Sequence, residues 1–199
     1  VYLKSLKISK AITKLMKAAF NPNIVQTLEE NPVLVHGGPF ANIAHGCNSL
    51  IATKLALKLS PIVITEAGFG GDLGAEKFLD IKCRVGGLHP NAIVMVATIR
   101  ALKLHGGQAF EDLTNENLEA LELGLANLKQ HMENMAKYDV PCVVCINHFE
   151  SDTENETKLL RKYCEEQGYK VAFCSAFSNG GKGASELATL VKDVLDNEE

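Results

Sequence analysis

Short apolar runs alternate along this chain with longer stretches in which apolar residues recur every three or four positions. The short runs predict buried strands, and the periodic stretches predict helices with one apolar face. The clearest helix spans residues 115–138, with Thr114 or Asn115 as its expected cap. Its apolar face carries Leu118, Leu121, Leu125, Leu128 and Met132. Alternating strands and helices imply right-handed crossovers and a parallel sheet.

We therefore expect an α/β fold with a mostly parallel sheet of about five strands and helices on both faces. The strands are expected at residues 33–35, 61–64, 92–97, 142–146 and 170–174. Other helices are expected before residue 21 and at residues 24–30, 47–59, 154–167 and 184–195. Asp152 or Thr153 is the expected cap of the helix at 154–167.

Composition narrows the class of protein. Hydrophobic residues make up 46% of the 199 residues and charged residues 22%, which is typical of a globular protein. No apolar run is long enough to span a bilayer and no signal peptide is apparent, so we expect a cytoplasmic protein without a membrane partner. The net charge is −4 and the basic residues are scattered, which argues against nucleic acid as a partner. The chain begins without Met inside a helical pattern, so we expect a piece of a longer protein.

Two predicted strand ends carry residues suited to an anion. The run at 61–64 leads into a glycine-rich segment, residues 68–74, whose backbone can approach a phosphate or carboxylate closely. The same glycines equally suit a tight turn without a ligand. The strand at 92–97 is followed by Arg100 and Lys103, which could pair with phosphate or lie on a solvated helix face. Such strand ends are where open α/β sheets bind ligands.

Two phenylalanines also follow predicted strand ends. Phe149 and Phe177 are expected at one edge of the sheet. Aromatic residues in such places commonly pack as hydrophobic plugs. Two rings on one rim can instead clamp a flat heterocycle, because stacking adds about 0.5–1.5 kcal/mol beyond burial. The sequence leaves both interpretations open.

Three blocks of the chain resemble one enzyme family. Residues 96–107, Val-Ala-Thr-Ile-Arg-Ala-Leu-Lys-Leu-His-Gly-Gly, are similar to the second signature of formate–tetrahydrofolate ligase, also called formyltetrahydrofolate synthetase. Residues 65–78 and 36–46 resemble flanking blocks of the same family. Three long blocks in the right order are far more specific than a lone glycine pattern, and the resemblance extends over residues 21–183.

The resemblance implies ATP-dependent ligation of formate to N10 of tetrahydrofolate through formyl phosphate. It implies that Phe69 and Gly70 lie against the formyl group and its phosphate, with Arg100 as the third catalytic residue. The residues that it implies for folate binding are Phe149, Phe177 and Phe173.

The sequence supports two of these folate residues differently. Phe149 lies in residues 147–156, which match the family's Asn-x-Phe-x-x-Asp-Thr-x-x-Glu block. Phe177 stands just before a glycine run, where the family would have tryptophan. A smaller ring should stack more weakly, which would lower the affinity for folate.

The resemblance also implies a P-loop-NTPase-like fold, with residues 1–107 as part of the nucleotide and formyl-phosphate domain and residues 108–199 as an α/β segment carrying the folate-binding loops. ATP, Mg²⁺ and tetrahydrofolate are the implied ligands, a monovalent cation is a further candidate, and no residue is assigned as a metal ligand. The full-length enzyme is expected to form a homo-oligomer. The chain has no Gly-x-x-x-x-Gly-Lys-Ser/Thr motif, so we expect a partial piece that is inactive alone.

Two other classes of function stay open. The first is a non-catalytic folate-binding or assembly module, which would bind folate without ATP. The second is a degenerate nucleotide-binding protein related to GTPases, because Asn147, Asp152 and the pair Ser175-Ala176 follow strands much as base-reading loops do. His148 directly follows Asn147, so the usual Asn-Lys-x-Asp order of that class is absent.

Overall fold

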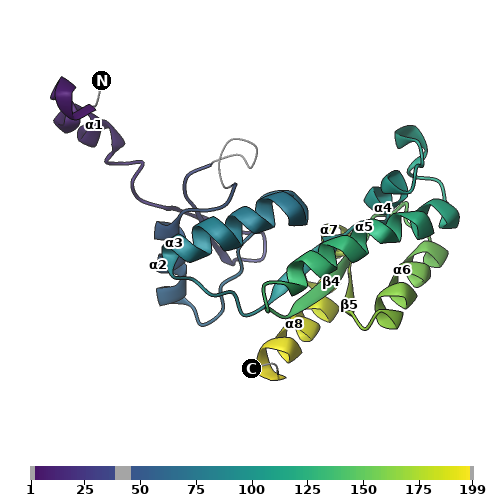
Figure 1. Ribbon diagram of the computed structural model, residues 1–199. Coiled ribbons are helices and arrows are strands. Elements are labelled where there is room, and N and C mark those ends of the chain that lie inside the picture. Colours follow the sequence, from purple (N-terminus) through teal and green to yellow (C-terminus); the bar gives the residue numbers. More distant parts are fainter. Residues whose placement is uncertain (1–2, 39–45, 198–199) are drawn as a thin grey trace. The chain divides into compact units, whose positions relative to one another are not determined.

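The computed structural model describes residues 3–38 and 46–197 (Figure 1). Most of the block at 36–46 therefore lies outside the described residues. The chain divides into two compact units, Val1–Leu88 and His89–Glu199, which we call the N-terminal unit and the C-terminal unit and describe separately. The earlier division at residue 107 concerns which ligands each part binds and stays a prediction.

The N-terminal unit contains a two-stranded antiparallel sheet. Its strands are β1 (Asn23–Gln26) and β2 (Pro32–Val35), with Asn23 opposite Val35. The helices of this unit are η1 (Leu3–Leu6), α1 (Ser9–Met16), α2 (Leu50–Leu59), η2 (Gly70–Gly74), η3 (Lys77–Cys83) and α3 (Arg84–Gly86). The last three follow one another closely, and η2 and η3 are π-helical.

Two predictions for this unit are wrong. Residues 24–30 are not a helix, because β-branched Ile24 and Val25 extend into β1 and a turn closed by the Thr27 N–H to Asn31 carbonyl bond returns the chain to β2. Residues 61–64 are not a strand, and Ile64 is 93% exposed. Among the described residues they have no neighbouring strand with which to pair.

The C-terminal unit is built on a parallel sheet of three strands. These are β3 (Ile93–Ala97), β4 (Cys142–Asn147) and β5 (Lys170–Cys174), in the order β3-β4-β5. The predicted positions of these strands are confirmed, but the expectation of about five strands in one parallel sheet is wrong for the described residues. Ala97 lies beside Ile146, and Asn147 beside Cys174, so the three carboxyl ends meet at one edge.

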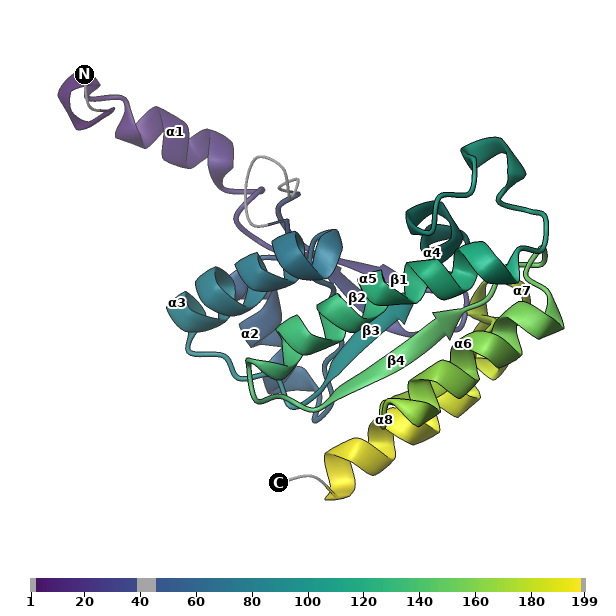
Figure 2. The same ribbon diagram turned by 45° about the vertical axis from the view of Figure 1, so that its right-hand side comes forward.

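Helices cover both faces of this sheet. They are α4 (Ile99–His105), η4 (Phe110–Asp112), α5 (Leu118–Ala136), α6 (Glu154–Glu166), α7 (Ala176–Gly183) and α8 (Ser185–Asn197). Val144 and Ile146 point into the core formed with α5 and α6. Val143 and Cys145 are buried on the opposite face, because neighbouring strand residues alternate, and α8 packs there against β5 and β4 (Figure 2).

Glycines bring α4 and α5 unusually close together. A Cβ on Gly124 would lie 1.9 Å from the carbonyl oxygen of Leu102, and one on Gly106 would lie 1.7 Å from that of Ala120. Neither position tolerates a side chain without a backbone shift. Gly106 in the signature block at 96–107 therefore serves helix packing, which holds the helix that carries Arg100.

Side-chain caps set the starts of the two helices that flank β4. Asn117 caps α5, two or three residues after the predicted Thr114 or Asn115, because its Oδ1 accepts from the Ala120 N–H at 2.9 Å. Thr153 caps α6, as one of the two alternatives predicted. It forms a reciprocal capping box with Glu156.

Within the described ranges, no helix combines the length and apolar character that a bilayer crossing requires.

Candidate functional site

The carboxyl edge of the three-stranded sheet gathers most of the predicted site residues. After β3, the Thr98 side chain accepts from the Ala101 N–H at 3.2 Å and starts α4, whose second residue is Arg100. After β4 comes the turn that carries Phe149, and after β5 comes α7, which carries Phe177. The parallel register places all three segments at the same end of the sheet.

The turn after β4 is fixed by backbone hydrogen bonds and one carboxylate. The His148 N–H donates to the carbonyl of Cys174 at 2.9 Å, which extends the ladder to β5. The Asp152 N–H donates to the carbonyl of Phe149 at 2.9 Å, and the Phe149 N–H donates to Oδ2 of Asp152 at 2.8 Å. This reciprocal pair holds the backbone of Phe149 in one conformation.

Arg100 and Phe149 are in direct contact. The guanidinium carbon lies 4.6 Å from the centre of the phenyl ring, which is a cation–π arrangement. The guanidinium also donates to Oγ of Ser151, from Nη2 at 2.9 Å and from Nε at 3.3 Å. The structure thus brings together one residue expected to be catalytic and one expected to bind folate.

The same turn contains a buried carboxylate, that of Asp152. Its side chain is 1% exposed, and Oδ1 has no hydrogen-bond partner among the described residues. Burial raises the pKa of Asp152, although the hydrogen bond from Phe149 and the nearby His148 oppose the shift. His148 Nδ1 is 3.8 Å from Oδ2, which is too long for a hydrogen bond.

The other two folate candidates occupy different environments. Phe173 belongs to β5, is half-buried and packs against the core, and its ring centre is 4.9 Å from that of His148 at a tilt of 43°. Phe177 lies in α7 and is 93% exposed. No ring contact joins Phe177 to Phe149 in the described part of the chain. The segment at 175–183, expected as a loop, is helical with a kink at Gly180, where φ is 57°.

The structure separates Lys103 from Arg100, although both are predicted as possible phosphate ligands. Lys103 is fully buried, and its Nζ donates to Oε1 of Glu156 at 2.7 Å and to the carbonyl of Asn115 at 2.8 Å. It reaches neither an anion at the surface nor the solvent, so both roles left open for Lys103, a phosphate ligand and a solvated face residue, are wrong. The Thr-x-x-Glu spacing of residues 153–156 marks Glu156 as a capping residue, but its partner Lys103 is distant in sequence.

Phe69 and Gly70 belong to the N-terminal unit. Phe69 is 90% exposed and directly precedes η2, and Gly70 has φ of 80°. The Gly74 N–H donates to the carbonyl of Phe69 at 2.9 Å, and a Cβ on Gly74 would lie 2.0 Å from the Gly68 backbone. The predicted glycine-rich loop is therefore a tight helix start, and its first turn contains Asp72 and no basic residue.

A buried lysine lies further along the same run of helices. Lys82 is 3% exposed, its Nζ has no hydrogen-bond partner among the described residues, and it lies 5.0 Å from the centre of the Phe78 ring. Burial lowers its pKa, while the neighbouring thiols of Cys47 and Cys83 act in the opposite direction. The sequence gives no sign of this cluster, because Cys47 is distant along the chain.

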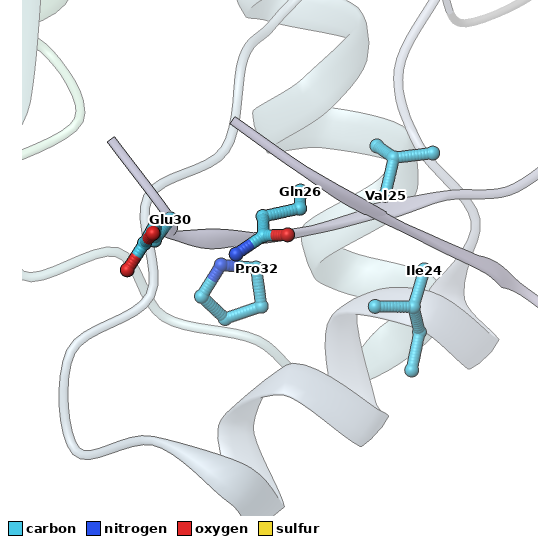
Figure 3. Close-up of a pocket in the computed structure, with 5 residues that line it drawn as sticks. All are labelled: Ile24, Val25, Gln26, Glu30 and Pro32. Atoms are coloured by element: carbon cyan, nitrogen blue, oxygen red, sulfur yellow. The ribbon is translucent and has the colours of Figure 1, made fainter. Parts of the chain in front are cut away.

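Two surface hollows are found among the described residues, one in each unit. One is on the β1–β2 hairpin and is lined by Ile24, Val25, Gln26, Glu30 and Pro32 (Figure 3). The other lies near the start of α5, between residues 106–108 and 117–123. Neither is lined by a predicted site residue.

Known proteins match this chain along its whole length. The family model described as formate–tetrahydrofolate ligase matches residues 1–199. The chain belongs to the formate–tetrahydrofolate ligase family. The chain is 57% identical over 199 residues, all of its length, to the formate–tetrahydrofolate ligase of Pelagibacter ubique (strain HTCC1062), and it covers 36% of that protein. It is 61% identical over 191 residues, 96% of its length, to the formate–tetrahydrofolate ligase of Zymomonas mobilis subsp. mobilis (strain ATCC 31821 / ZM4 / CP4), of which it covers 34%.

The family membership confirms the resemblance drawn from the three sequence blocks. The chain spans about a third of the length of these two ligases. In this chain, Arg100 lies over the ring of Phe149 at the edge of the parallel sheet.

Proposed function

We propose that this chain is part of an enzyme that ligates formate to N10 of tetrahydrofolate with ATP, and that it is inactive alone. The observation that carries this function is the match to the ligase family over all 199 residues. The sheet edge with Arg100 and Phe149 gives the match a physical site. Because the relatives are about three times as long, the complete activity belongs to the longer enzyme.

The reaction needs an activated formate. The negative charge and resonance of formate disfavour attack by an amine, so the γ-phosphoryl group of ATP is first transferred to a formate oxygen, giving formyl phosphate and ADP. The N10 amine then attacks the formyl carbon, the C–O bond to phosphate breaks, and N10 loses its proton. Positioning and charge neutralisation dominate such phosphoryl transfers.

Folate is assigned to the edge of the C-terminal unit. The ring of Phe149 is held by its turn and is half-exposed, and that of Phe177 is 93% exposed, so both offer surface for stacking with a pterin. Phe173 lies one layer deeper, in β5, and supports the site through His148. The tryptophan expected at position 177 is replaced by a smaller ring, so we expect weaker stacking there.

The formyl phosphate is assigned to Phe69 and Gly70, with Arg100 as a third catalytic residue. The exposed ring of Phe69 and the uncovered backbone at Gly70 suit the small formyl group. Asp72 in the first turn of η2 opposes an anion, so the positive charge for the phosphate has to come from other residues. Arg100 and the lysine of a P-loop outside this chain would supply that charge.

The remaining assignments follow the family. We propose a P-loop-NTPase-like fold for the longer enzyme, with residues 1–107 in the nucleotide and formyl-phosphate domain and residues 108–199 carrying the folate site. A cytoplasmic homo-oligomer using Mg²⁺ and a monovalent cation fits this chemistry. The described residues hold no group of three or more His, Cys, Asp or Glu side chains that could bind a metal ion.

An assay of the full-length ligase tests this function. Product formation should require formate, ATP and tetrahydrofolate together, and Phe69→Ala should lower turnover at least tenfold without weakening tetrahydrofolate binding. Phe110→Ala, which removes another exposed ring that has no assigned role, is the matched control. Tetrahydrofolate binding without any ligation would favour the non-catalytic folate module, and binding of guanine nucleotide without folate would favour the GTPase-related class.

A further inference from the structure

Arg100 contacts two residues of the turn after β4, Phe149 and Ser151. The guanidinium packs on the Phe149 ring at 4.6 Å, and two of its nitrogens donate to Ser151 Oγ. Two hydrogen bonds to one oxygen therefore orient the guanidinium while its carbon lies over the phenyl ring. Arginine suits this arrangement because its rigid fork and flat surface act together, which a lysine ammonium cannot reproduce.

The backbone of Phe149 is held by hydrogen bonds within the turn itself. The buried carboxylate of Asp152 accepts a hydrogen bond from the Phe149 N–H at 2.8 Å, and the Asp152 N–H donates to the Phe149 carbonyl. Phe149 is thus restrained at the backbone by Asp152 and at the ring by Arg100. A ring fixed in this way loses little conformational freedom when a second flat group stacks on it.

We propose that Arg100 is a positioning residue for folate recognition: it covers one face of the Phe149 ring, so that the pterin stacks on the opposite face of that ring. The order of layers is guanidinium, phenyl ring, pterin. This role rests on the proposed function. It adds to the charge that Arg100 would supply to the formyl phosphate, because through Phe149 the guanidinium also acts on the folate.

The two roles of Arg100 predict different kinetic changes. As a positioning residue, Arg100 affects the binding of tetrahydrofolate measured in the absence of formate and ATP. As a phosphate ligand, it affects the steps that form formyl phosphate and leaves tetrahydrofolate binding unchanged. Ser151 separates the two further, since its hydroxyl orients the guanidinium without altering the charge of Arg100.

The test uses the full-length ligase and three variants. Arg100→Lys keeps the charge but loses the flat face, Ser151→Ala keeps the guanidinium but loses its anchor, and Lys158→Ala, an exposed charge on α6, is the matched control. Calorimetry gives the Kd of tetrahydrofolate without formate or ATP, and steady-state kinetics give the KM of formate and of ATP. Circular dichroism shows that each variant is folded.

We expect Arg100→Lys and Ser151→Ala to raise the Kd of tetrahydrofolate about five- to tenfold, the loss that corresponds to one side chain no longer held in place. In Ser151→Ala, which keeps the charge of Arg100, the KM values of formate and ATP should stay within about twofold, and Lys158→Ala should match the unmodified ligase. An unchanged Kd of tetrahydrofolate in both variants overturns the positioning role, whether or not the KM of formate rises. If the unmodified ligase binds no tetrahydrofolate, the folate site of the proposed function fails and the positioning role fails with it.

Discussion

Glu156 accepts hydrogen bonds from three separate parts of the chain. Its Oε1 accepts from Lys103 Nζ at 2.7 Å and from the Asn117 N–H at 3.0 Å, and its Oε2 accepts from the Thr153 N–H at 3.1 Å. Both charged side chains are fully buried. A buried pair of this kind contributes little relative to an apolar pair, but removing one partner leaves the other as an isolated charge.

Glu156→Gln should therefore lower the free energy of unfolding by about 3–5 kcal/mol, because Lys103 would remain buried without a counter-charge. Urea unfolding of the 199-residue chain at pH 7, with the slope m unchanged, measures this loss. The matched control is Glu154→Gln in the same helix, whose partner Lys158 is exposed, and it should change the value by less than about 1 kcal/mol. A loss below about 1 kcal/mol for Glu156→Gln would contradict the assigned importance of the pair.

The same residue makes stability depend on pH. Burial alone would raise the pKa of Glu156, but hydrogen bonds from Lys103, Thr153 and Asn117 outweigh it and hold the pKa below the ordinary 4.5. A lowered native pKa stabilises the folded state at every pH above the ordinary value, and this contribution is lost as pH falls through the native pKa.

The difference in unfolding free energy between the unmodified chain and Glu156→Gln should therefore be constant from pH 7 to about pH 5 and shrink only below 4.5. Unfolding curves for both chains at each pH give this difference. A difference that already declines between pH 7 and pH 5 would show that the pKa of Glu156 is raised, not lowered.

At the scale of elements, the close contact of α4 with α5 holds Arg100 at the sheet edge. Gly124 lies in the middle of α5, where helix propensity favours alanine by about 1 kcal/mol. The position of its missing Cβ, 1.9 Å from the Leu102 carbonyl oxygen, predicts the opposite effect. Packing and propensity thus differ in sign at this residue.

We expect Gly124→Ala to lower the free energy of unfolding by about 2 kcal/mol or more, because α4 has to move away from α5. Ala126→Gly, at an exposed position of the same helix, isolates propensity and should cost about 1 kcal/mol. Urea unfolding of both variants measures these changes. Stabilisation by Gly124→Ala would mean that the two helices are not in the contact described.

Elements with a strong period could be predicted from the sequence, and short or glycine-rich ones could not. The strands at 92–97, 142–146 and 170–174 lie in apolar runs, and α5 has a clear helical period, so local pattern and tertiary packing agree. The segment at 24–30 is too short for the spacing of its apolar residues to distinguish a helix from a strand. Its pairing with β2 depends on the turn at 27–31. Residues 68–74 contain glycines that permit a loop or a tight helix start, and packing against Gly68 selects the helix.

The location of the candidate site could be predicted from the sequence, but the contacts within it could not. The rule that parallel strands present their carboxyl ends at one edge brings Arg100 and Phe149 together correctly. Arg100 and Lys103 are three positions apart on one helix, so the sequence treats them alike. The packing of α6 places Glu156 against Lys103. This contact determines that Lys103 is buried while Arg100 reaches the edge of the sheet.

At the scale of the whole molecule, the chain belongs to the formate–tetrahydrofolate ligase family and spans about a third of the length of its relatives. The folate platform that we propose, the ring of Phe149 at the carboxyl edge of the three-stranded sheet, lies within the C-terminal unit. The chemistry of formate activation needs charge that the glycine-rich segment of this chain does not provide. Of the steps that we propose, folate binding therefore depends most directly on the residues present.

The most direct measurement is a calorimetric titration of tetrahydrofolate into the full-length ligase, compared with Phe149→Ala and with Phe110→Ala as the matched exposed ring. We predict that Phe149→Ala weakens binding about tenfold, equivalent to roughly 1.4 kcal/mol for a lost stacking surface, while Phe110→Ala binds as the unmodified enzyme does. Equal affinities for the enzyme and its folded Phe149→Ala variant would contradict the folate platform at this sheet edge.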